Sequence, residues 1–323
     1  MTDTTVLYVG GTGRSGSTVL ANLLGEVTGY VSVGEVRFLW ERGIVEDRLC
    51  GCGRRFSQCD FWVEVLDRAF GDDRPAAQDL HVRLYDKTRL RSLPAFVLRG
   101  VDDALPDSAS GSPADLSDVL ARLYAAIAAV AGATVVVDSS KLPTYAATLA
   151  RVPGLDVRIL HLVRDPRAAA FSWLRQKEQP DRVTPGYMEQ RGVLKSAGLW
   201  TSWNGALELM WRGRRSKAYH RLAYEDFVAS PRSELGSIVS WMGSGSEHER
   251  CFTGENTVRL GVHHTVAGNP ARLDRGDVSL TLDDEWVEEL SRGDQRLVRL
   301  GTLPLLHRYG YPSHPGPRGG HSE

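Results

Sequence analysis

The amino-acid sequence predicts an α/β fold with three layers, α/β/α, around a central parallel sheet. Two observations lead to this prediction. Short apolar runs stop at glycines or polar residues, and helix-like patterns follow them. The runs are also largely uninterrupted, which is typical of strands buried on both faces of a parallel sheet. They lie at residues 6–9, 133–141, 157–163 and 217–223, with a shorter candidate at 31–33.

The first apolar run ends in a glycine-rich turn. Gly10, Gly11 and Gly13 permit a tight turn and a close backbone approach. From Ser17 onward, apolar residues recur at helical spacing. Such a turn binds anions, because its free N–H groups and the positive end of the helix point at the ligand. It could instead be a simple connection, but Arg-Ser-Gly-Ser-Thr at residues 14–18 favours a binding site.

This turn is close to the phosphate-binding pattern G-x-x-x-x-G-K-[ST] of nucleotide-binding proteins. Gly11, Gly16 and Thr18 match the spacing, but Ser17 stands in the position of the lysine. That lysine normally reaches the β- and γ-phosphates, so the difference disfavours ordinary ATP or GTP chemistry. Arg14 supplies a positive charge from inside the loop instead. The sequence therefore predicts a P-loop NTPase-like fold whose loop binds an anion other than a triphosphate.

Composition sets wider bounds on function. The chain has 323 residues, 42% of them hydrophobic, which suffices for a full core. A net charge of −1 gives no signal for nucleic acid or a membrane surface. No apolar run is long enough to span a bilayer, and a strand pattern within the first residues leaves no room for a signal peptide. We therefore expect a cytoplasmic protein with reduced thiols.

Two strand ends carry further candidate residues. Glu35 follows the short strand at 31–33, and open α/β sheets place their ligand sites at such ends. Lys141 ends the strand at 133–141, from where it can reach the first loop. Plainer alternatives are a helix-start charge for Glu35 and a surface lysine before a turn. Asp138 could also be a magnesium ligand of an NTPase. We expect Glu35 to act as a general base and Lys141 to be a second cation near the loop.

The strand at 157–163 opens directly into a helix start. Asp165 suits the helix cap and Pro166 the first turn. Arg164 again lies at a strand end, and Ser172 follows eight residues later, about two helical turns on. Both side chains can therefore face a second anion at the same edge of the sheet, although Arg-Asp-Pro alone occurs at many helix starts.

Three cysteines and two histidines raise the question of a metal. Cys50, Cys52 and Cys59 lie close in the sequence, but a structural zinc site usually has four ligands with paired spacing. No fourth ligand lies at a convincing spacing. His263 and His264 have no acidic or cysteine partner at ligand spacing either. We expect a loop packed by buried thiols, and no metal.

The remaining patterns predict helices and loops. A loop at 179–186 is expected to be mobile and to cover a site, and a basic loop at 263–276 to fold over an anion. We expect one domain over residues 1–311, with a disordered tail at 312–323. Helical insertions around 61–98 are expected to shape an acceptor pocket. Helices are predicted at 61–70, 80–98, 115–131, 196–211, 231–242 and 284–300, with a polar loop at 102–113.

Taken together, the motifs resemble the sulfotransferases that use 3′-phosphoadenosine 5′-phosphosulfate (PAPS). The likeness is greatest to the branch of tyrosylprotein and carbohydrate sulfotransferases and their bacterial relatives. Residues 13–18 resemble the 5′-phosphosulfate loop of that family. Residues 163–172, with Arg164 and Ser172, resemble its 3′-phosphate motif. Each motif lies at a strand-to-helix turn, and the resemblance extends to about Arg275.

The resemblance implies roles for individual residues. The glutamate of Gly-Glu in that branch is the catalytic base, and a lysine contacts the transferring sulfate. Arg175 stands one residue before an arginine that relatives carry, so its role is left open. The implied catalytic residues are Glu35, Arg14 and Lys141; the implied cofactor-binding residues are Gly13, Arg14, Ser15, Gly16, Ser17, Thr18, Arg164, Ser172, Tyr224, Asn269 and Arg272.

The resemblance also implies the reaction. A sulfuryl group passes from PAPS to a hydroxyl of a small molecule, glycoside or lipid by in-line displacement, without a metal, and leaves adenosine 3′,5′-bisphosphate (PAP). Two alternatives stay open. A P-loop kinase acting on a small molecule shares the fold, but Ser17 in the lysine position counts against it. A non-catalytic PAPS-binding protein is disfavoured by the presence of Glu35, Arg14 and Lys141 together.

Overall fold

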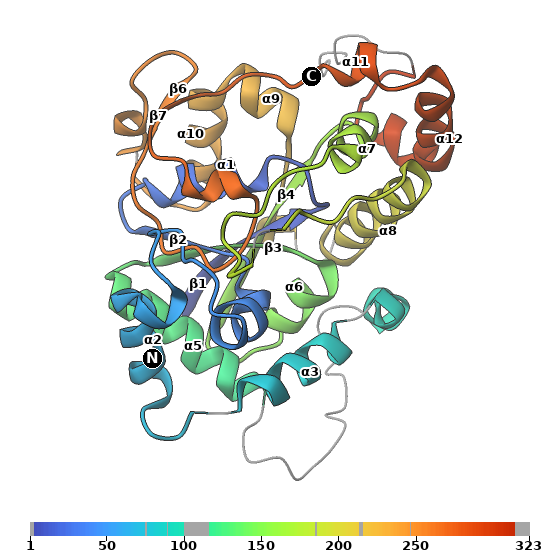
Figure 1. The fold of residues 1–323 in the computed structure, drawn as a ribbon. Helices are drawn as coiled ribbons and strands as arrows, with labels where there is room; N and C mark the ends of the chain where they lie inside the picture. The colour runs from blue at the N-terminus through green and yellow to red at the C-terminus, as the bar shows by residue number, and fades with distance from the viewer. Residues whose placement is uncertain are drawn as a thin grey trace.

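A five-stranded parallel sheet forms the centre of the protein (Figure 1). The computed structural model describes residues 3–74, 76–88, 90–99, 116–184, 186–212, 216–245 and 247–313. The strand order is β2-β3-β1-β4-β5, so the first strand lies in the middle and the chain winds outward in both directions. The strands are β1 (Thr4–Gly11), β2 (Tyr30–Gly34), β3 (Val135–Lys141), β4 (Leu155–Val163) and β5 (Tyr219–Ala223).

Helices cover both faces of this sheet, which confirms the predicted three-layer α/β/α fold. The alternation along β1 sets the two cores, because Val6 and Tyr8 point into one layer and Leu7 and Val9 into the other. One layer holds α1 (Ser17–Gly25), α9 (Tyr224–Ala229) and α10 (Pro231–Trp241); the other holds α2 (Asp60–Phe70), α3 (Ala77–Lys87), α4 (Leu93–Arg99), α5 (Leu116–Ala131), α6 (Pro143–Leu149) and α8 (Val193–Trp211).

The remaining elements pack at the periphery. An antiparallel pair, β6 (Thr257–Leu260) and β7 (Gly276–Ser279), lies beside the α1 layer. Against α8 pack α7 (Pro166–Leu174) and α12 (Arg292–Arg308), with α11 (Trp286–Glu289) next to α7. In the described part of the chain, every helix is too short or too polar to cross a lipid bilayer.

Several boundaries differ from those predicted by the sequence. The helix expected at 80–98 is two helices, α3 and α4, with a short 3₁₀ turn between them at 90–92. The helix expected at 284–300 is likewise split into α11 and a longer α12. After β2 the chain forms a 3₁₀ turn at 36–38 and a π-helix at 39–45, neither of which is among the helices predicted from the sequence. The expected loop at 102–113 and most of the tail lie outside the described residues.

The glycine-rich turn after β1 depends on a close contact between two strands. Gly11 has φ +135°, and a Cβ built on it lies 2.3 Å from the carbonyl oxygen of Leu162 on β4. Neither the backbone conformation nor the space allows a side chain. Gly16 has φ +83°, and its Cβ would lie 2.4 Å from the ring of Tyr224. The glycines therefore set how closely the loop approaches the neighbouring strand ends.

We expect Gly11→Ala to lower the free energy of unfolding by about 3 kcal/mol or more, because it combines backbone strain with a backbone clash. Gly154→Ala is the matched control: φ is +82°, but no atom lies within 4 Å of the new Cβ. It should cost about 1 kcal/mol. Urea unfolding of both variants measures the difference, and equal losses would contradict this account of the turn.

Candidate active site

A single cavity collects residues from the carboxyl ends of all five parallel strands. It has a volume of about 960 Å³. Gly13 follows β1, Glu35 follows β2, Lys141 ends β3, Arg164 follows β4, and Tyr224 follows β5; all five line the cavity. Parallel strands end at the same edge, so residues far apart in the sequence meet there.

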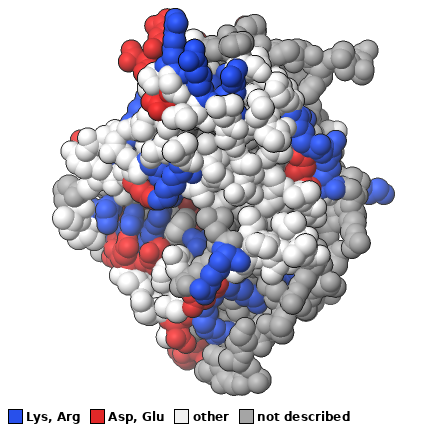
Figure 2. Space-filling model, turned by 90° about the vertical axis from the view of Figure 1, so that its right-hand side faces the viewer, with Lys and Arg blue, Asp and Glu red and all other residues white. Residues whose placement is uncertain are grey.

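The cavity is strongly basic although the chain as a whole is nearly neutral. Ten of its described lining residues are lysine or arginine and three are aspartate or glutamate, whereas the net charge of the chain is −1. On the outer face shown in Figure 2, basic and acidic side chains lie mixed together. The concentration of positive charge is therefore a property of the cavity, and it favours a ligand with several negative charges.

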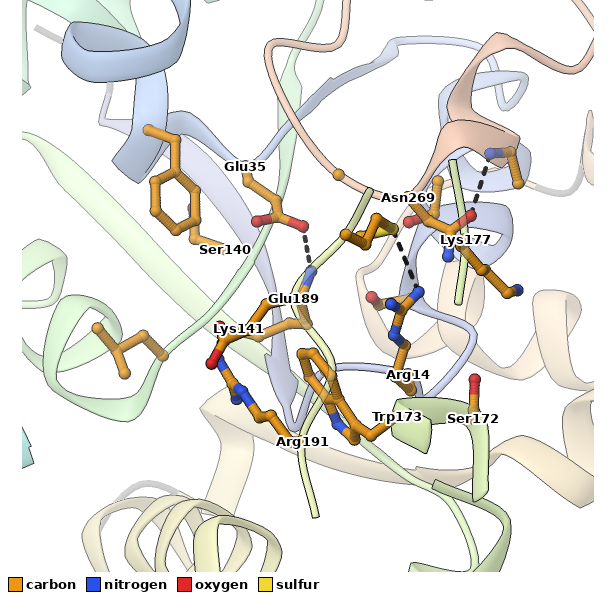
Figure 3. A pocket seen from close by; sticks show the side chains of 18 of the residues that line it. Arg14, Glu35, Ser140, Lys141, Ser172, Trp173, Lys177, Glu189, Arg191 and Asn269 are labelled. Carbon is orange, nitrogen blue, oxygen red and sulfur yellow. Dashed lines mark hydrogen bonds and ion pairs between the residues drawn. The ribbon is translucent and has the colours of Figure 1, made fainter. Parts of the chain in front are cut away.

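Arg14 lies in the first loop with its side chain directed into the cavity (Figure 3). Its backbone has φ 67°, an unusual value for a residue with a side chain. The guanidinium lies over the ring of Trp173, 4.8 Å from the ring centre, and one nitrogen is 3.3 Å from the sulfur of Met188. The atoms Nε and Nη2 are buried and have no partner among the described residues. Two donors of a fixed cation therefore remain for an anion.

Several cations crowd this part of the cavity. Burial lowers the pKa of Arg14, and the nearby positive charge of Arg191 lowers it further. Burial also lowers the pKa of Lys177, and the charges of Arg14 and Arg175 add to this effect. Both shifts have the sign expected when a cation loses water and faces other cations. A bound anion would stabilise the charged forms of Arg14 and Lys177 and so oppose both pKa shifts.

Arg164 connects the first loop to the second predicted motif. Its Nη1 donates to the carbonyl oxygen of Arg14 at 3.1 Å, and its Nη2 lies 3.2 Å from a carboxylate oxygen of Asp283. The guanidinium also lies over the ring of Tyr224, 4.6 Å from its centre. Its Nε is buried without a partner among the described residues. Ser172, two turns into α7, lines the same cavity.

Glu35 and Lys141 form an ion pair on the cavity wall, with 2.6 Å between Nζ and Oε1 (Figure 3). Both side chains are about nine-tenths buried, at 10% and 11% exposed. The Lys141 Nζ also donates to the carbonyl oxygen of Ser139 at 2.9 Å. Lys141 has φ 68°, so it shares the left-handed backbone conformation of Arg14. Non-glycine residues held in this conformation occur often at functional sites.

Asp138 does not face the cavity, so the structure gives no support to the magnesium alternative. Its carboxylate is fully buried and accepts hydrogen bonds from the hydroxyl of Tyr124 and from the N–H and hydroxyl of Ser140. The Ser140 hydroxyl in turn accepts a hydrogen bond from the backbone N–H of Arg37. Asp138 therefore holds the end of β3 against the segment after β2, which positions Lys141 beside Glu35.

The structure brings most of the predicted residues to the cavity but not all of them. Ser15 is buried within the loop, where its hydroxyl donates to the carbonyl oxygen of Thr12. Arg272 is 2% exposed and does not line the cavity, because it donates to backbone carbonyls of Thr265 and Leu49 and pairs with Asp181. The predicted residues that line the cavity are Gly13, Arg14, Gly16, Ser17, Thr18, Glu35, Lys141, Arg164, Ser172, Tyr224 and Asn269.

Other lining residues were not predicted as site residues. Lys177, Arg191 and Met188 come from the segment between α7 and α8, and Asp283 precedes α11. Gln179 and Arg182 belong to the loop that was expected to cover a site. None of these positions follows a strand of the parallel sheet, so the rule that located Glu35 and Arg164 could not find them. Their excess of basic residues in one segment is the only signal that the sequence offers.

Known proteins resemble this chain in sequence and in fold. The model of a family described as the sulfotransferase family matches residues 7–247. The sulfotransferase domain from the Synechococcus PCC 7002 olefin synthase is similar with a TM-score of 0.56 and 17% identity, over 96% of each chain. The sulfotransferase domain from the curacin biosynthetic pathway has a TM-score of 0.56 and 18% identity, over 98% of this chain and 99% of that one. A search of curated protein sequences finds no match.

Asp138 gives a testable dependence of stability on pH. Burial raises its pKa from 3.8 to about 6. The folded state therefore holds this proton more tightly than the unfolded state, and stability from this group falls as pH rises from about 4 to about 6. The fall is about 3 kcal/mol. Urea unfolding of wild type and Asp138→Asn between pH 4 and 7 isolates the effect, since other groups cancel in the difference. A constant difference across this range would contradict it.

Proposed function

Because the chain belongs to the sulfotransferase family, we propose that it transfers a sulfuryl group from PAPS to a hydroxyl group. The observation that carries the proposal is the pairing of two anion subsites in one cavity. One lies at the loop after β1 with Arg14, and the other at the end of β4 with Arg164. The hydrogen bond between these two residues holds the subsites side by side. PAPS carries anionic groups at its 5′ and 3′ ends, so it matches both.

The chain's own residues suit sulfuryl transfer. Ser17 and Thr18 at the N-terminus of α1 bind the 5′-phosphate, where backbone N–H groups and the helix dipole favour negative charge. Arg164 and Ser172 bind the 3′-phosphate. Tyr224 packs under the guanidinium of Arg164 and fixes its plane. Such transfers depend on positioning and charge stabilisation more than on covalent help from the protein.

In the proposed step, Glu35 accepts the proton of the acceptor hydroxyl. The acceptor oxygen attacks sulfur in line with the bond between sulfur and the bridging oxygen. That bond breaks, and its electron pair leaves with PAP. Lys141 and Arg14 stabilise the negative charge that develops on the bridging and sulfuryl oxygens. The ion pair of Glu35 and Lys141 keeps the base and this cation on the same wall.

The acceptor is proposed to be a small hydroxylated molecule, glycoside or lipid. The cavity that contains Glu35 is also lined by Phe38, Tyr85 and Trp203, aromatic surfaces suited to an organic acceptor. The names of the two similar structures refer to an olefin synthase and to the curacin biosynthetic pathway. Assignment to the tyrosylprotein and carbohydrate branch rests on the Gly-Glu segment at Glu35, and a cytoplasmic location on the sequence alone.

Calorimetric titration with PAP tests the donor site. We expect metal-independent binding that weakens about 10- to 100-fold in Arg164→Ala, because a charge-assisted hydrogen bond to phosphate is lost. Arg158→Ala is the matched control, since Arg158 lies on β4, the strand that Arg164 follows, but outside the cavity. Binding of ATP with Mg²⁺ but not of PAP would contradict the proposal and favour a small-molecule kinase.

Glu35→Gln tests the base. We expect turnover of PAPS with a panel of phenols and alcohols to fall about 10²- to 10⁴-fold, while PAP affinity stays within a few-fold of wild type. Glu189→Gln is the control, because Glu189 lines the cavity but is half exposed and pairs with Arg191 and Lys195. Near-normal turnover in Glu35→Gln would exclude this base. Binding of PAP by wild type without turnover of any acceptor would favour a non-catalytic PAPS-binding protein.

A further inference from the structure

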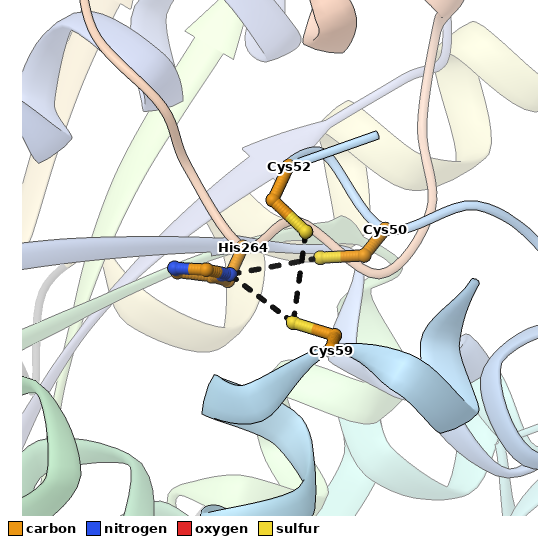
Figure 4. Close-up of side chains that lie close together, drawn as sticks. All are labelled: Cys50, Cys52, Cys59 and His264. Atoms are coloured by element: carbon orange, nitrogen blue, oxygen red, sulfur yellow. Dashed lines mark hydrogen bonds between the residues drawn. The ribbon is translucent and has the colours of Figure 1, made fainter. Parts of the chain in front are cut away.

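Three cysteines and a histidine meet outside the active-site cavity (Figure 4). Cys50, Cys52 and Cys59 lie in the loop before α2, and His264 lies in the loop after β6, 205 residues beyond Cys59. Their three sulfurs and the Nδ1 of His264 all lie within 4.8 Å of one another. No fourth ligand lies beside the cysteines in the sequence, because His264 comes from a distant segment that the fold brings back.

The spacing of these atoms is close to that of a tetrahedral metal site. With zinc–sulfur bonds of about 2.3 Å and zinc–nitrogen bonds of about 2.0–2.1 Å, ligand atoms lie ~3.8 Å (S···S) and ~3.6 Å (S···N) apart. Here the Cys52 and Cys59 sulfurs are 3.7 Å apart. The Nδ1 of His264 lies 3.2 Å from the Cys59 sulfur and 3.9 Å from that of Cys50. A contraction of about 1 Å at the longest separation completes the tetrahedron.

The alternative of a disulfide does not explain this arrangement. All four cysteines of the chain are free. A separation of 3.7 Å between the sulfurs of Cys52 and Cys59 is far longer than the ~2.05 Å of a disulfide bond. A disulfide would also use two of the three sulfurs and leave His264 without a role. All four groups are suitable zinc ligands, and four protein ligands form a closed, structural type of site.

The groups around the cluster hold the histidine in place. The imidazole of His264 stacks on the ring of Phe61 with 4.7 Å between ring centres and 12° between planes. The indole N–H of Trp62 donates to the carbonyl oxygen of His264 at 2.8 Å. Cys59 is the N-cap of α2, where the helix dipole favours a thiolate. The ring therefore presents Nδ1 to the sulfurs through contacts that do not involve them.

We propose that Cys50, Cys52, Cys59 and His264 bind one structural zinc ion. Three thiolates, a neutral imidazole and Zn²⁺ carry a net charge of −1. Arg275 lies close enough to offset this charge, since it donates to the carbonyl oxygen of Gly51 at 3.2 Å. The ion ties the loop before α2 to the loop after β6.

The second of these loops continues into the active-site cavity. Gly268 and Asn269, four and five residues after His264, line the cavity. The two loops already touch closely, because the Gly51 N–H donates to the Thr265 carbonyl oxygen and a Cβ on Gly51 would lie 2.3 Å from the Thr265 hydroxyl. The zinc ion would add a strong link at this junction and so fix the position of Asn269.

Metal analysis of the whole protein tests this proposal. We expect about one zinc per chain by mass spectrometry after purification with a phosphine reductant from zinc-supplemented cells. Cys59→Ser and His264→Ala should each reduce this to about a tenth or less. Cys251→Ser is the matched control, because Cys251 is a buried thiol in a separate core, and it should keep its zinc. Loss of the ion should lower the Tm by about 10 °C.

A second measurement does not require the ligand variants to fold. The Cys251→Ser protein contains only the three clustered thiols, so titration with a mercurial should release all its zinc after three equivalents. Exchange of the ion for Co²⁺ should give thiolate charge-transfer bands and the intense visible bands of a tetrahedral site. Wild-type protein without zinc and without these cobalt bands would overturn the proposal. So would a disulfide among the three cysteines, or zinc retained in both Cys59→Ser and His264→Ala.

Discussion

The active-site cavity depends on positive charge that is held away from water. Arg14, Lys177 and Arg164 are buried or half-buried beside one another, and the described chain offers them few carboxylates. Burial and mutual repulsion make such a cluster costly in the folded protein without a ligand. The packing of the rest of the fold holds the strand ends together and offsets this unfavourable free energy. A multiply charged anion neutralises the repulsion between these cations when it binds. The free energy that the cluster costs in the unliganded protein therefore contributes to affinity and selectivity for anionic ligands.

The backbone contributes to this arrangement as much as the charges do. Arg14 and Lys141 both occupy left-handed conformations, and Lys141 pairs with Gly10 across the ends of β3 and β1. The buried carboxylate of Asp138 fixes the last residues of β3 by accepting hydrogen bonds from the N–H and hydroxyl of Ser140. A lysine on an unconstrained loop would sample many positions. Here its ammonium group stays beside Glu35, so the proposed base and this cation need little reorganisation when a substrate binds.

The sequence predicted those parts of the site that follow strands. Glu35, Lys141 and Arg164 could be located because an apolar run, a polar stop and a helix start are local patterns, and parallel strands end at one edge. Lys177 and Asp283 could not, since nothing local marks an irregular segment that folds over a cavity. Arg272 was predicted to bind the cofactor, but it does not line the cavity. Its guanidinium joins three backbone and side-chain groups of distant loops, which only the tertiary structure reveals.

The proposed zinc site shows most clearly that local sequence patterns do not reveal ligands from distant segments. Cys50, Cys52 and Cys59 supply only three ligands. Because no fourth ligand lies near them in the sequence, the sequence alone led to the expectation of no metal. The fold supplies His264 from beyond β6, through loops that Arg272 and Thr265 already hold against residues 49–51.

Asp283 places a negative charge among the cations of the cavity. Its carboxylate pairs with Arg164 and Arg175, so it occupies the position of an anion in the second subsite. Under the proposed function, a 3′-phosphate bound beside Arg164 must share or displace these contacts. Its binding energy is then the difference between two ion pairs rather than the full value of one. Under the proposed function, this exchange lowers the affinity for PAP, which leaves the site after each transfer.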